Sequence, residues 1–237
     1  LDDTRFWVVR ARVAGSGVTG LSTLLSGAYI GIDIGTSSES RRILQAARAA
    51  GLGLKLHADE LEPGGGAELA AELQATSADH LAAISEAGIG ALAAAGTVAA
   101  LLPGTMMFLG RPSHAPARRL VEAGVPVALA TDFNPGTSPT VNFPLILTLG
   151  LSQLHLSVAE ALVAATVNGA AALGLAAETG QIAPGFSADL ALFDIEDARE
   201  LPYWYGDRRC RATWIRGIAC HGAGVDGTFP RSPGRPL

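Results

Sequence analysis

The stretch Lys55-Leu-His-Ala-Asp-Glu60 decides how this chain of 237 residues is interpreted. It closes a short apolar run, Leu52 to Leu56, with a histidine and two carboxylates. A buried strand of a parallel sheet has this pattern, apolar along its length and polar at its carboxyl end. In a (β/α) barrel these strand ends surround the active site, so catalytic groups and ligands gather there. The stretch therefore predicts a barrel strand that delivers His57 to a functional site.

The same pattern recurs at two other places in the chain. Ala75-Thr-Ser-Ala-Asp-His-Leu81 places His80 at the end of a second strand, and Val125-Pro-Val-Ala-Leu-Ala-Thr-Asp132 ends in Asp132. A charged group that closes a buried strand needs a partner. Two histidines and an aspartate, each closing a predicted strand, predict a divalent-metal site. In that site His57 and Asp132 would bind the ion, which makes hydroxide available near neutral pH.

The other polar groups near these ends have candidate roles, and two of them also have an ordinary interpretation. Glu60 could reach the metal-bound water or hold a substrate nitrogen, or it could be a solvated loop carboxylate. His80 could polarise a substrate carbonyl or stabilise an oxyanion. The backbone amides of Gly136 and Thr137, with the Asn134 side chain, suit a small anionic substrate, but they also suit an ordinary Pro-Gly turn.

The remaining histidines, His114, His155 and His221, are assigned to the core or the surface, because none of them ends a predicted barrel strand. Between the strand ends the sequence alternates strand-like and helix-like segments, with right-handed crossovers expected. Further strands are expected over residues 28–34 and 97–102, and helices over 67–73, 85–95, 116–123, 142–151, 158–166 and 168–175. From Gly180 onward the pattern changes to a small β unit, with a bend at Gly217.

Bulk properties narrow the possible partners and location. The formal charge of -5 and the pI of about 5.5, without a basic cluster, argue against a nucleic-acid or anionic-membrane partner. Two cysteines ten residues apart, Cys210 and Cys220, favour a reduced cytosolic protein. Neither a signal-peptide pattern nor a bilayer-length apolar run is present in the sequence, so we expect a cytoplasmic protein.

Several segments closely resemble the imidazolonepropionase family of the amidohydrolase superfamily. The likeness runs in order from about Ser38 to His221, and the segment Thr-Asp-Phe-Asn-Pro-Gly is specific to that family. The other segments are Lys-Leu-His-Ala-Asp-Glu, Gly-Gly-Ala-Glu-Leu-Ala-Ala-Glu-Leu, Ser-Ala-Asp-His-Leu and Ala-Leu-Leu-Pro-Gly. The resemblance implies hydrolytic opening of 4-imidazolone-5-propanoate to N-formimidoyl-glutamate, on one zinc or iron ion.

The resemblance also implies a role for each matched residue. His57 and Asp132 match metal ligands, and Asp132 is also counted among the catalytic residues. Glu60 matches a carboxylate that contacts substrate and activates water, and His80 matches the catalytic histidine. Asn134, Gly136 and Thr137 match substrate contacts. The implied fold is an amidohydrolase-type (β/α) barrel over residues 28–178, followed by a small β-sandwich portion over 179–237, with residues 1–27 unclear.

The chain also departs from the family pattern. The family draws two more metal ligands from an H-x-H motif, and this sequence contains none. Fewer than sixty residues precede His57, while each β-α unit needs about thirty. We therefore expect a barrel truncated to its later strands, impaired hydrolysis, and a homo-oligomer or a complex with a missing N-terminal piece. The alternatives are another amidohydrolase of cyclic amides or amidines, and a non-catalytic fragment that needs a partner chain.

Overall fold

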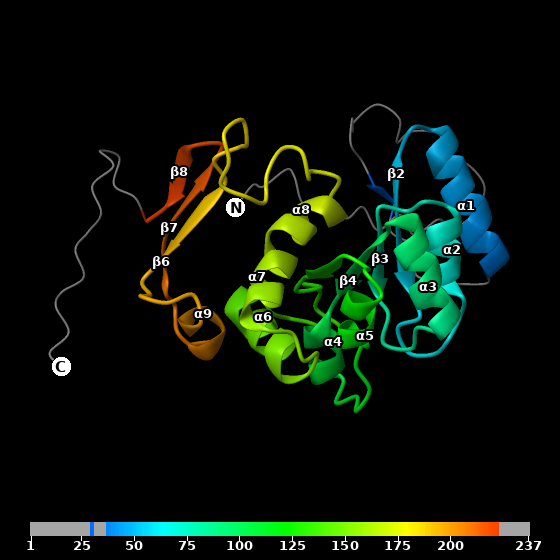
Figure 1. The fold of residues 1–237 in the computed structure, drawn as a ribbon, viewed down its shortest axis with the longest axis horizontal. Helices are drawn as coiled ribbons and strands as arrows, with labels where there is room; N and C mark the ends of the chain where they lie inside the picture. Colours follow the sequence, from blue (N-terminus) through cyan, green and yellow to red (C-terminus); the bar gives the residue numbers. More distant parts are fainter. Residues whose placement is uncertain (1–28, 31–36, 223–237) are drawn as a thin grey trace, which may run out of the picture.

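The computed structural model describes residues 29–30 and 37–222 (Figure 1). The segment 1–27 lies outside this range, as does most of the strand expected over residues 28–34. Its described part, Tyr29–Ile30, forms strand β1. In the described part of the chain, no helix is both long enough and apolar enough to span a membrane.

Five parallel strands form the main sheet, in the order β1-β2-β3-β4-β5. Successive strands are neighbours because an intervening helix returns the chain to the same edge each time, as in repeated β-α units. The register pairs His57 with Asp79 and Ala58 with His80, so the polar ends of β2 and β3 lie side by side. The strands after β1 are β2 Gly53–Ala58, β3 Ser77–His80, β4 Val98–Leu101 and β5 Val127–Leu129.

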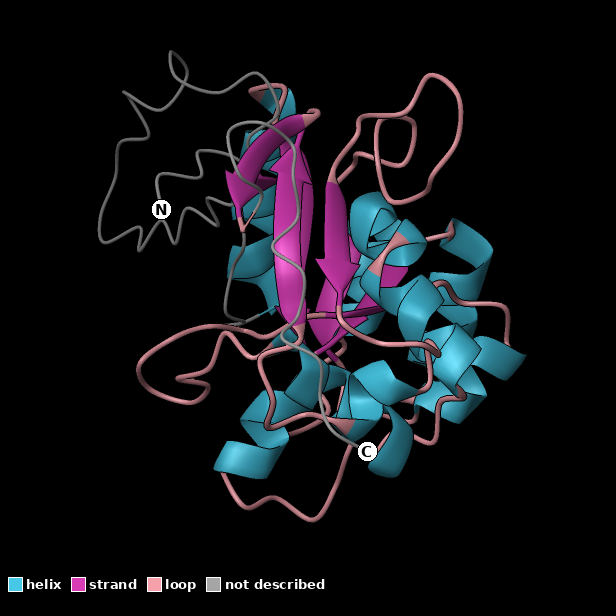
Figure 2. Ribbon diagram, turned by 90° about the vertical axis from the view of Figure 1, so that its left-hand side faces the viewer, coloured by secondary structure: helices cyan, strands magenta, loops and turns pink. Residues whose placement is uncertain are grey.

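Helices pack against this sheet and enclose the main core. In Figure 2 the strands nearest the viewer belong to the C-terminal sheet, and the helices lie mostly behind them. Alternate strand residues such as Leu56, Leu101 and Leu129 are buried in that core. Helix α3 starts after Ser85, whose hydroxyl accepts the Gly88 N–H, and it ends at Gly96 with φ 68°, as predicted. The helices around the core are α1 Ser37–Ala49, α2 Gly66–Glu72, α3 Glu86–Ala95, α5 Ala117–Glu122, α6 Phe143–Ser152 and α7 Val158–Ala165.

Helix α4, Pro103–Phe108, departs from the sequence expectation, which placed only the end of a strand at Pro103-Gly104. Proline is favoured in the first turn of a helix, because its missing N–H would have no helical partner there. Strand β4 ends at Leu101, and α4 begins two residues later at Pro103. As a result Thr105, in the first turn of α4, is fully buried.

The strand residues that alternate with the main core face the other side of the sheet. There Val98, Ala100 and Ala128 pack against Ala172 of α8, Val167–Ala172. The Asn168 side-chain amide of α8 donates to the Val127 carbonyl at 2.8 Å. Helix α8 thus covers this second face at β4 and β5.

The C-terminal part contains an antiparallel sheet of three strands, which lies at the opposite end of the molecule from α1 (Figure 1). Arg216 and Gly217 both have positive φ, at 51° and 76°, which suits a two-residue hairpin and confirms the bend predicted at Gly217. The described residues here form one sheet, so the second layer of the expected β-sandwich stays a prediction. The elements are β6 Leu190–Phe193, α9 Glu200–Tyr203, β7 Cys210–Ile215 and β8 Ile218–His221.

Candidate metal centre

Three side chains with metal-binding atoms converge at the carboxyl ends of β2 and β3. One ligand atom each from His57, Glu60 and His80 lies within 4.8 Å of the other two. The rings of His57 and His80 meet edge to face, with their centroids 4.8 Å apart. A carboxylate oxygen of Glu60 lies 3.7 Å from Nδ1 of His80. Three residues singled out from the sequence pattern therefore share one place in the fold.

Left-handed backbone marks the ends of the strands that supply these groups. Asp59 has φ 48°, His80 has φ 76°, Leu81 has φ 64° and Asp132 has φ 51°. Such conformations cost non-glycine residues about 1 to 3 kcal/mol each, and they persist only where the surroundings hold them. They cluster at functional sites, so their position here supports placing the site at these strand ends.

Asp59 holds the loop that carries Glu60. Its Oδ1 accepts hydrogen bonds from the backbone N–H of Gly64 at 2.7 Å and of Gly66 at 3.2 Å, and its Oδ2 accepts one from Ala67 at 2.9 Å. These donors belong to the glycine turn and the first turn of α2, where backbone N–H groups lack helical partners and favour an anion. The carboxylate therefore fixes the Glu60 loop to the start of α2.

Asp132 follows β5 and belongs to a separate network, outside the group of three. Its Oδ2 accepts a hydrogen bond from the Thr105 hydroxyl at 2.6 Å and one from the Asn134 side-chain amide at 3.3 Å. Sequence reasoning missed Thr105. The only available signal was its place just after the end of β4, and the Pro-Gly pair before it suggested a turn. Both of these hydrogen bonds end on Oδ2, and the other carboxylate oxygen of Asp132, Oδ1, has no hydrogen-bond donor among the described residues.

The expected substrate loop after Asp132 is closed on itself. The side-chain carbonyl of Asn134 accepts hydrogen bonds from the N–H groups of Gly136 at 2.9 Å and Thr137 at 2.8 Å. The Asn134 amide in turn donates to the Asp132 carbonyl at 2.8 Å and to the Thr137 hydroxyl at 3.0 Å. The loop thus forms an Asn-centred turn. Its two amides are directed at a side-chain carbonyl oxygen in the present conformation.

A buried polar network lies on β2 and β3, just before the histidines at the carboxyl ends of these strands. Lys55, two residues before His57 on the same side of β2, donates to the Ser77 hydroxyl and to the Ala172 carbonyl at 2.8 Å. Ser77 donates to Asp79 at 2.6 Å, and the Lys55 ammonium lies 3.9 Å from the same carboxylate oxygen. The sequence did not predict this network, although Lys55 is the first residue of the stretch Lys55 to Glu60 that predicted the strand.

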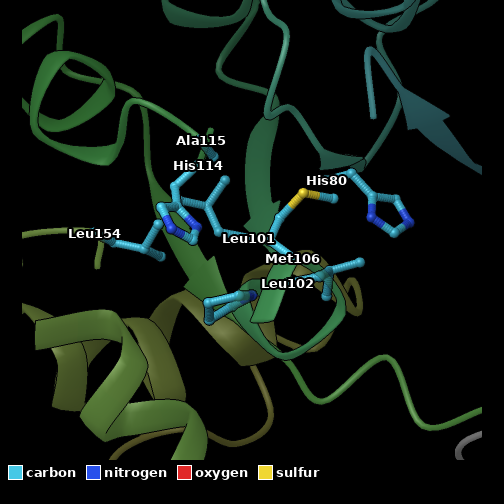
Figure 3. Close-up of a pocket in the computed structure, with 8 residues that line it drawn as sticks. His80, Leu101, Leu102, Met106, His114, Ala115 and Leu154 are labelled. Atoms are coloured by element: carbon cyan, nitrogen blue, oxygen red, sulfur yellow. The ribbon is translucent and has the colours of Figure 1, made fainter. Parts of the chain in front are cut away.

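A small cavity adjoins the group (Figure 3). It measures about 10 Å³, room for about one water molecule, and His80 and His114 lie on opposite sides of Leu101 and Met106. The Nδ1 atom of His114 is buried and has no hydrogen-bond partner among the described residues. His114, assigned to the core or surface from the sequence, therefore lies nearer to the site than its sequence position indicated.

The donor set suits a divalent ion. Two imidazole nitrogens and a carboxylate oxygen are ligands for zinc and for ferrous iron. Tetrahedral zinc keeps its ligand atoms about 3.4 Å apart, so the three side chains would each move by roughly 1 Å or less to reach one ion. The His80 side chain is 3% exposed and that of Glu60 is 30% exposed, so the group is buried on one side and open on the other.

A parallel β-α sheet with a histidine-carboxylate group at the carboxyl ends of its strands is the arrangement of a metal-dependent barrel enzyme. The chain belongs to the amidohydrolase family, because the model described as "Amidohydrolase family" matches residues 9–218.

Curated relatives confirm the resemblance seen in the sequence. The chain is 51% identical over 176 residues to imidazolonepropionase of Bacillus velezensis, an alignment that covers 74% of this chain and 42% of that protein. It is also 51% identical over 171 residues to imidazolonepropionase of Geobacillus kaustophilus, covering 72% of this chain and 40% of that one. The chain thus spans about two fifths of the length of these relatives.

Solved structures confirm the fold. The chain superposes on an adenosine deaminase from Xanthomonas campestris with bound zinc at a TM-score of 0.70, with 21% identity, covering 81% of this chain and 51% of that one. It superposes on 5-methylcytosine deaminase from Klebsiella pneumoniae at 0.69, with 22% identity, covering 88% and 58%. The α/β amidohydrolase fold is therefore established, while the residue roles and the domain boundaries given above stay predictions.

Proposed function

We propose that this chain forms part of a metal-dependent hydrolase that opens 4-imidazolone-5-propanoate to N-formimidoyl-L-glutamate. The observation that carries the proposal is the convergence of His57, Glu60 and His80 in a chain that is 51% identical over 176 residues to an imidazolonepropionase. One zinc or iron ion is the expected cofactor, and the bound ion would supply a Lewis acid near the scissile amide.

The proposed roles follow from the chemistry of each group and from the resemblance to imidazolonepropionases. His57 and Asp132 hold the ion. Glu60 accepts the proton of the attacking water and contacts a ring nitrogen, since its carboxylate is partly open to solvent. His80 stabilises the charge that develops on the ring carbonyl oxygen. Its burial strengthens this interaction, because little water screens it.

The turn after Asp132 is proposed to bind the propanoate carboxylate. The N–H groups of Gly136 and Thr137 now donate to the Asn134 side chain, which occupies the place that an anion would take. Binding therefore requires the Asn134 side chain to rotate away and offer its amide to the substrate. This exchange keeps each backbone donor hydrogen-bonded in both states. It also breaks the hydrogen bonds from the Asn134 amide to the Asp132 carbonyl and the Thr137 hydroxyl, and the new bond to the substrate must offset their loss.

Because the curated relatives are more than twice as long as the matched segment, we test the function within a relative. The segment of the Bacillus velezensis enzyme that aligns with this chain is replaced by the corresponding residues of this chain. Loss of substrate is followed by its ultraviolet absorbance. We expect the chimera to hydrolyse the substrate. Glu60→Gln should lower turnover by at least about 100-fold. The control His155→Ala, at an exposed histidine, should keep the turnover of the chimera.

A chimera that folds and binds metal but hydrolyses a different cyclic amide or amidine faster would contradict the proposed substrate. A chimera that binds metal and hydrolyses none of these compounds would contradict the proposed enzyme class. The isolated chain is predicted to show little or no turnover, because its sequence has no H-x-H motif to complete the family's ligand set.

A further inference from the structure

We propose that this chain binds zinc through His57, Glu60 and His80, at a position distinct from the one that uses His57 and Asp132. The two positions share His57, so only one can be filled at a time. The inference does not rest on the proposed reaction, because it concerns the affinity of the chain for the ion alone.

The ligand atoms of this position already lie close together. Among the described residues, His57, Glu60 and His80 form the group of three whose ligand atoms all lie within 4.8 Å of one another, and Asp132 is not a member. A zinc site that keeps three protein ligands and one open position needs this number of donors. Glu60 and His80 have already been brought together, with 3.7 Å between carboxylate and Nδ1.

The backbone around these side chains is also fixed. His80 ends β3 in a left-handed conformation, and Asp59 anchors the residue next to Glu60 with three hydrogen bonds to the start of α2. His57 lies within β2, which pairs directly with β3. Ligands held on rigid elements lose little freedom when an ion binds, so most of the coordination energy appears as affinity.

The two positions also differ in the number of protein ligands that they offer. Asp132 accepts hydrogen bonds from Thr105 and Asn134 on Oδ2, which leaves Oδ1 as its available ligand atom. With His57 it would supply two ligands, one fewer than the group of three supplies. An ion in the three-ligand position occupies the groups assigned to proton transfer and oxyanion stabilisation. This consequence, unlike zinc binding itself, rests on the proposed function: groups that hold the ion are not available for proton transfer or oxyanion stabilisation.

The experiment measures zinc binding to the whole purified chain by calorimetry. Visible absorption of Co²⁺ serves as a second probe, because it reports the geometry of the ligands. We expect one ion per chain. Zinc binding should weaken by more than roughly 100-fold in each of the variants His80→Ala, Glu60→Gln and His57→Ala. This loss exceeds the one expected when a residue that is only hydrogen-bonded to a metal ligand is replaced. Asp132→Asn should change the affinity less than about threefold, as should the control His155→Ala.

The opposite pattern overturns the inference. Zinc affinity that falls in Asp132→Asn and stays unchanged in His80→Ala would assign the ion to His57 and Asp132. Affinity unchanged in all the site variants would place the ion elsewhere. Circular dichroism of each metal-free variant shows whether it is folded. If His80→Ala is not folded, His80→Gln replaces it, since an amide keeps the volume and the polarity but is a poor zinc ligand.

The failure of this inference and that of the proposed function are distinguishable. Zinc binding through Asp132 would leave the hydrolysis of imidazolonepropanoate by the chimera possible. A chimera without activity would leave the ligand set measured on this chain unchanged.

Discussion

Replacing Lys55 with methionine tests the buried network that lies below the site. Lys55 is 9% exposed, and its ammonium donates to Ser77 and to the Ala172 carbonyl while it lies 3.9 Å from Asp79. Methionine has a similar volume, so the substitution removes the charge and the donors and creates little cavity. Asp79, which is 8% exposed, would then keep a buried negative charge with one hydroxyl donor.

The magnitude follows from what is left unpaired. Removing one partner of a buried ion pair costs about 3 to 5 kcal/mol, far more than the net contribution of the intact pair. For a chain of this size each kcal/mol lowers the melting temperature by roughly 2 to 4 °C, so Lys55→Met should melt roughly 6 to 20 °C lower. The loss arises mainly from the stranded carboxylate of Asp79. The double variant Lys55→Met/Asp79→Asn should therefore be more stable than Lys55→Met.

The assay is urea unfolding of the wild type, both single variants and the double variant, analysed as a double-mutant cycle. We expect a coupling free energy between Lys55 and Asp79 of at least about 1 kcal/mol. A Lys55→Met variant within about 1 kcal/mol of the wild type, or single effects that add within about 0.5 kcal/mol, would refute the reasoning. Either result would mean that water or a rearranged side chain compensates the carboxylate.

Three further predictions concern other parts of the molecule. Gly88→Ala should destabilise the chain by about 1 to 3 kcal/mol, because the new Cβ would lie 2.9 Å from a side-chain carbon of Ile84. The control is Gly90→Ala on the same helix, whose Cβ would meet no atom within 4 Å. Thermal melts should show that this control is more stable than the wild type by up to about 1 kcal/mol. The hydrogen bonds from Arg118 are the largest cause that lowers the pKa of Glu160 from 4.5 to about 2. Its contribution to stability is complete above pH 4.5 and is lost as the pH falls toward 2, so the melting temperatures of the wild type and Glu160→Gln should converge over that range. Thr105→Val should lower hydrolysis by the chimera roughly 10- to 100-fold with its fold unchanged by circular dichroism, because Asp132 loses its 2.6 Å donor.

What could be predicted from the sequence was local. Strands β2 and β3 follow from apolar runs that end in polar groups, and the bounds of α3 follow from Ser85 and Gly96, which cap it. Each of these signals lies within a few residues of the feature that it predicts. The grouping of His57, Glu60 and His80 was also accessible, since parallel strands bring their carboxyl ends to one edge.

What could not be predicted depends on contacts between residues far apart in the chain. Thr105 meets Asp132 across 27 residues, and Lys55 meets the Ala172 carbonyl across 117. In neither pair does the sequence around one residue indicate which residue it contacts. Helix α4 was missed for a different reason. Proline and glycine were taken to end a strand, although proline is equally suited to begin a helix.

The side chains of the site are oriented by left-handed backbone conformations, which the sequence indicates only weakly. Aspartate tolerates left-handed φ, so Asp59 and Asp132 carried a faint signal, while His80 and Leu81 carried none. The strain at these positions must be offset by interactions nearby. Asp59 offsets it with three hydrogen bonds, and His80 and Leu81 with nearly complete burial. The residues that orient the groups of the candidate metal centre are therefore also the ones that hold the strand ends in place, so we expect substitutions at this edge of the sheet to change stability and metal affinity together.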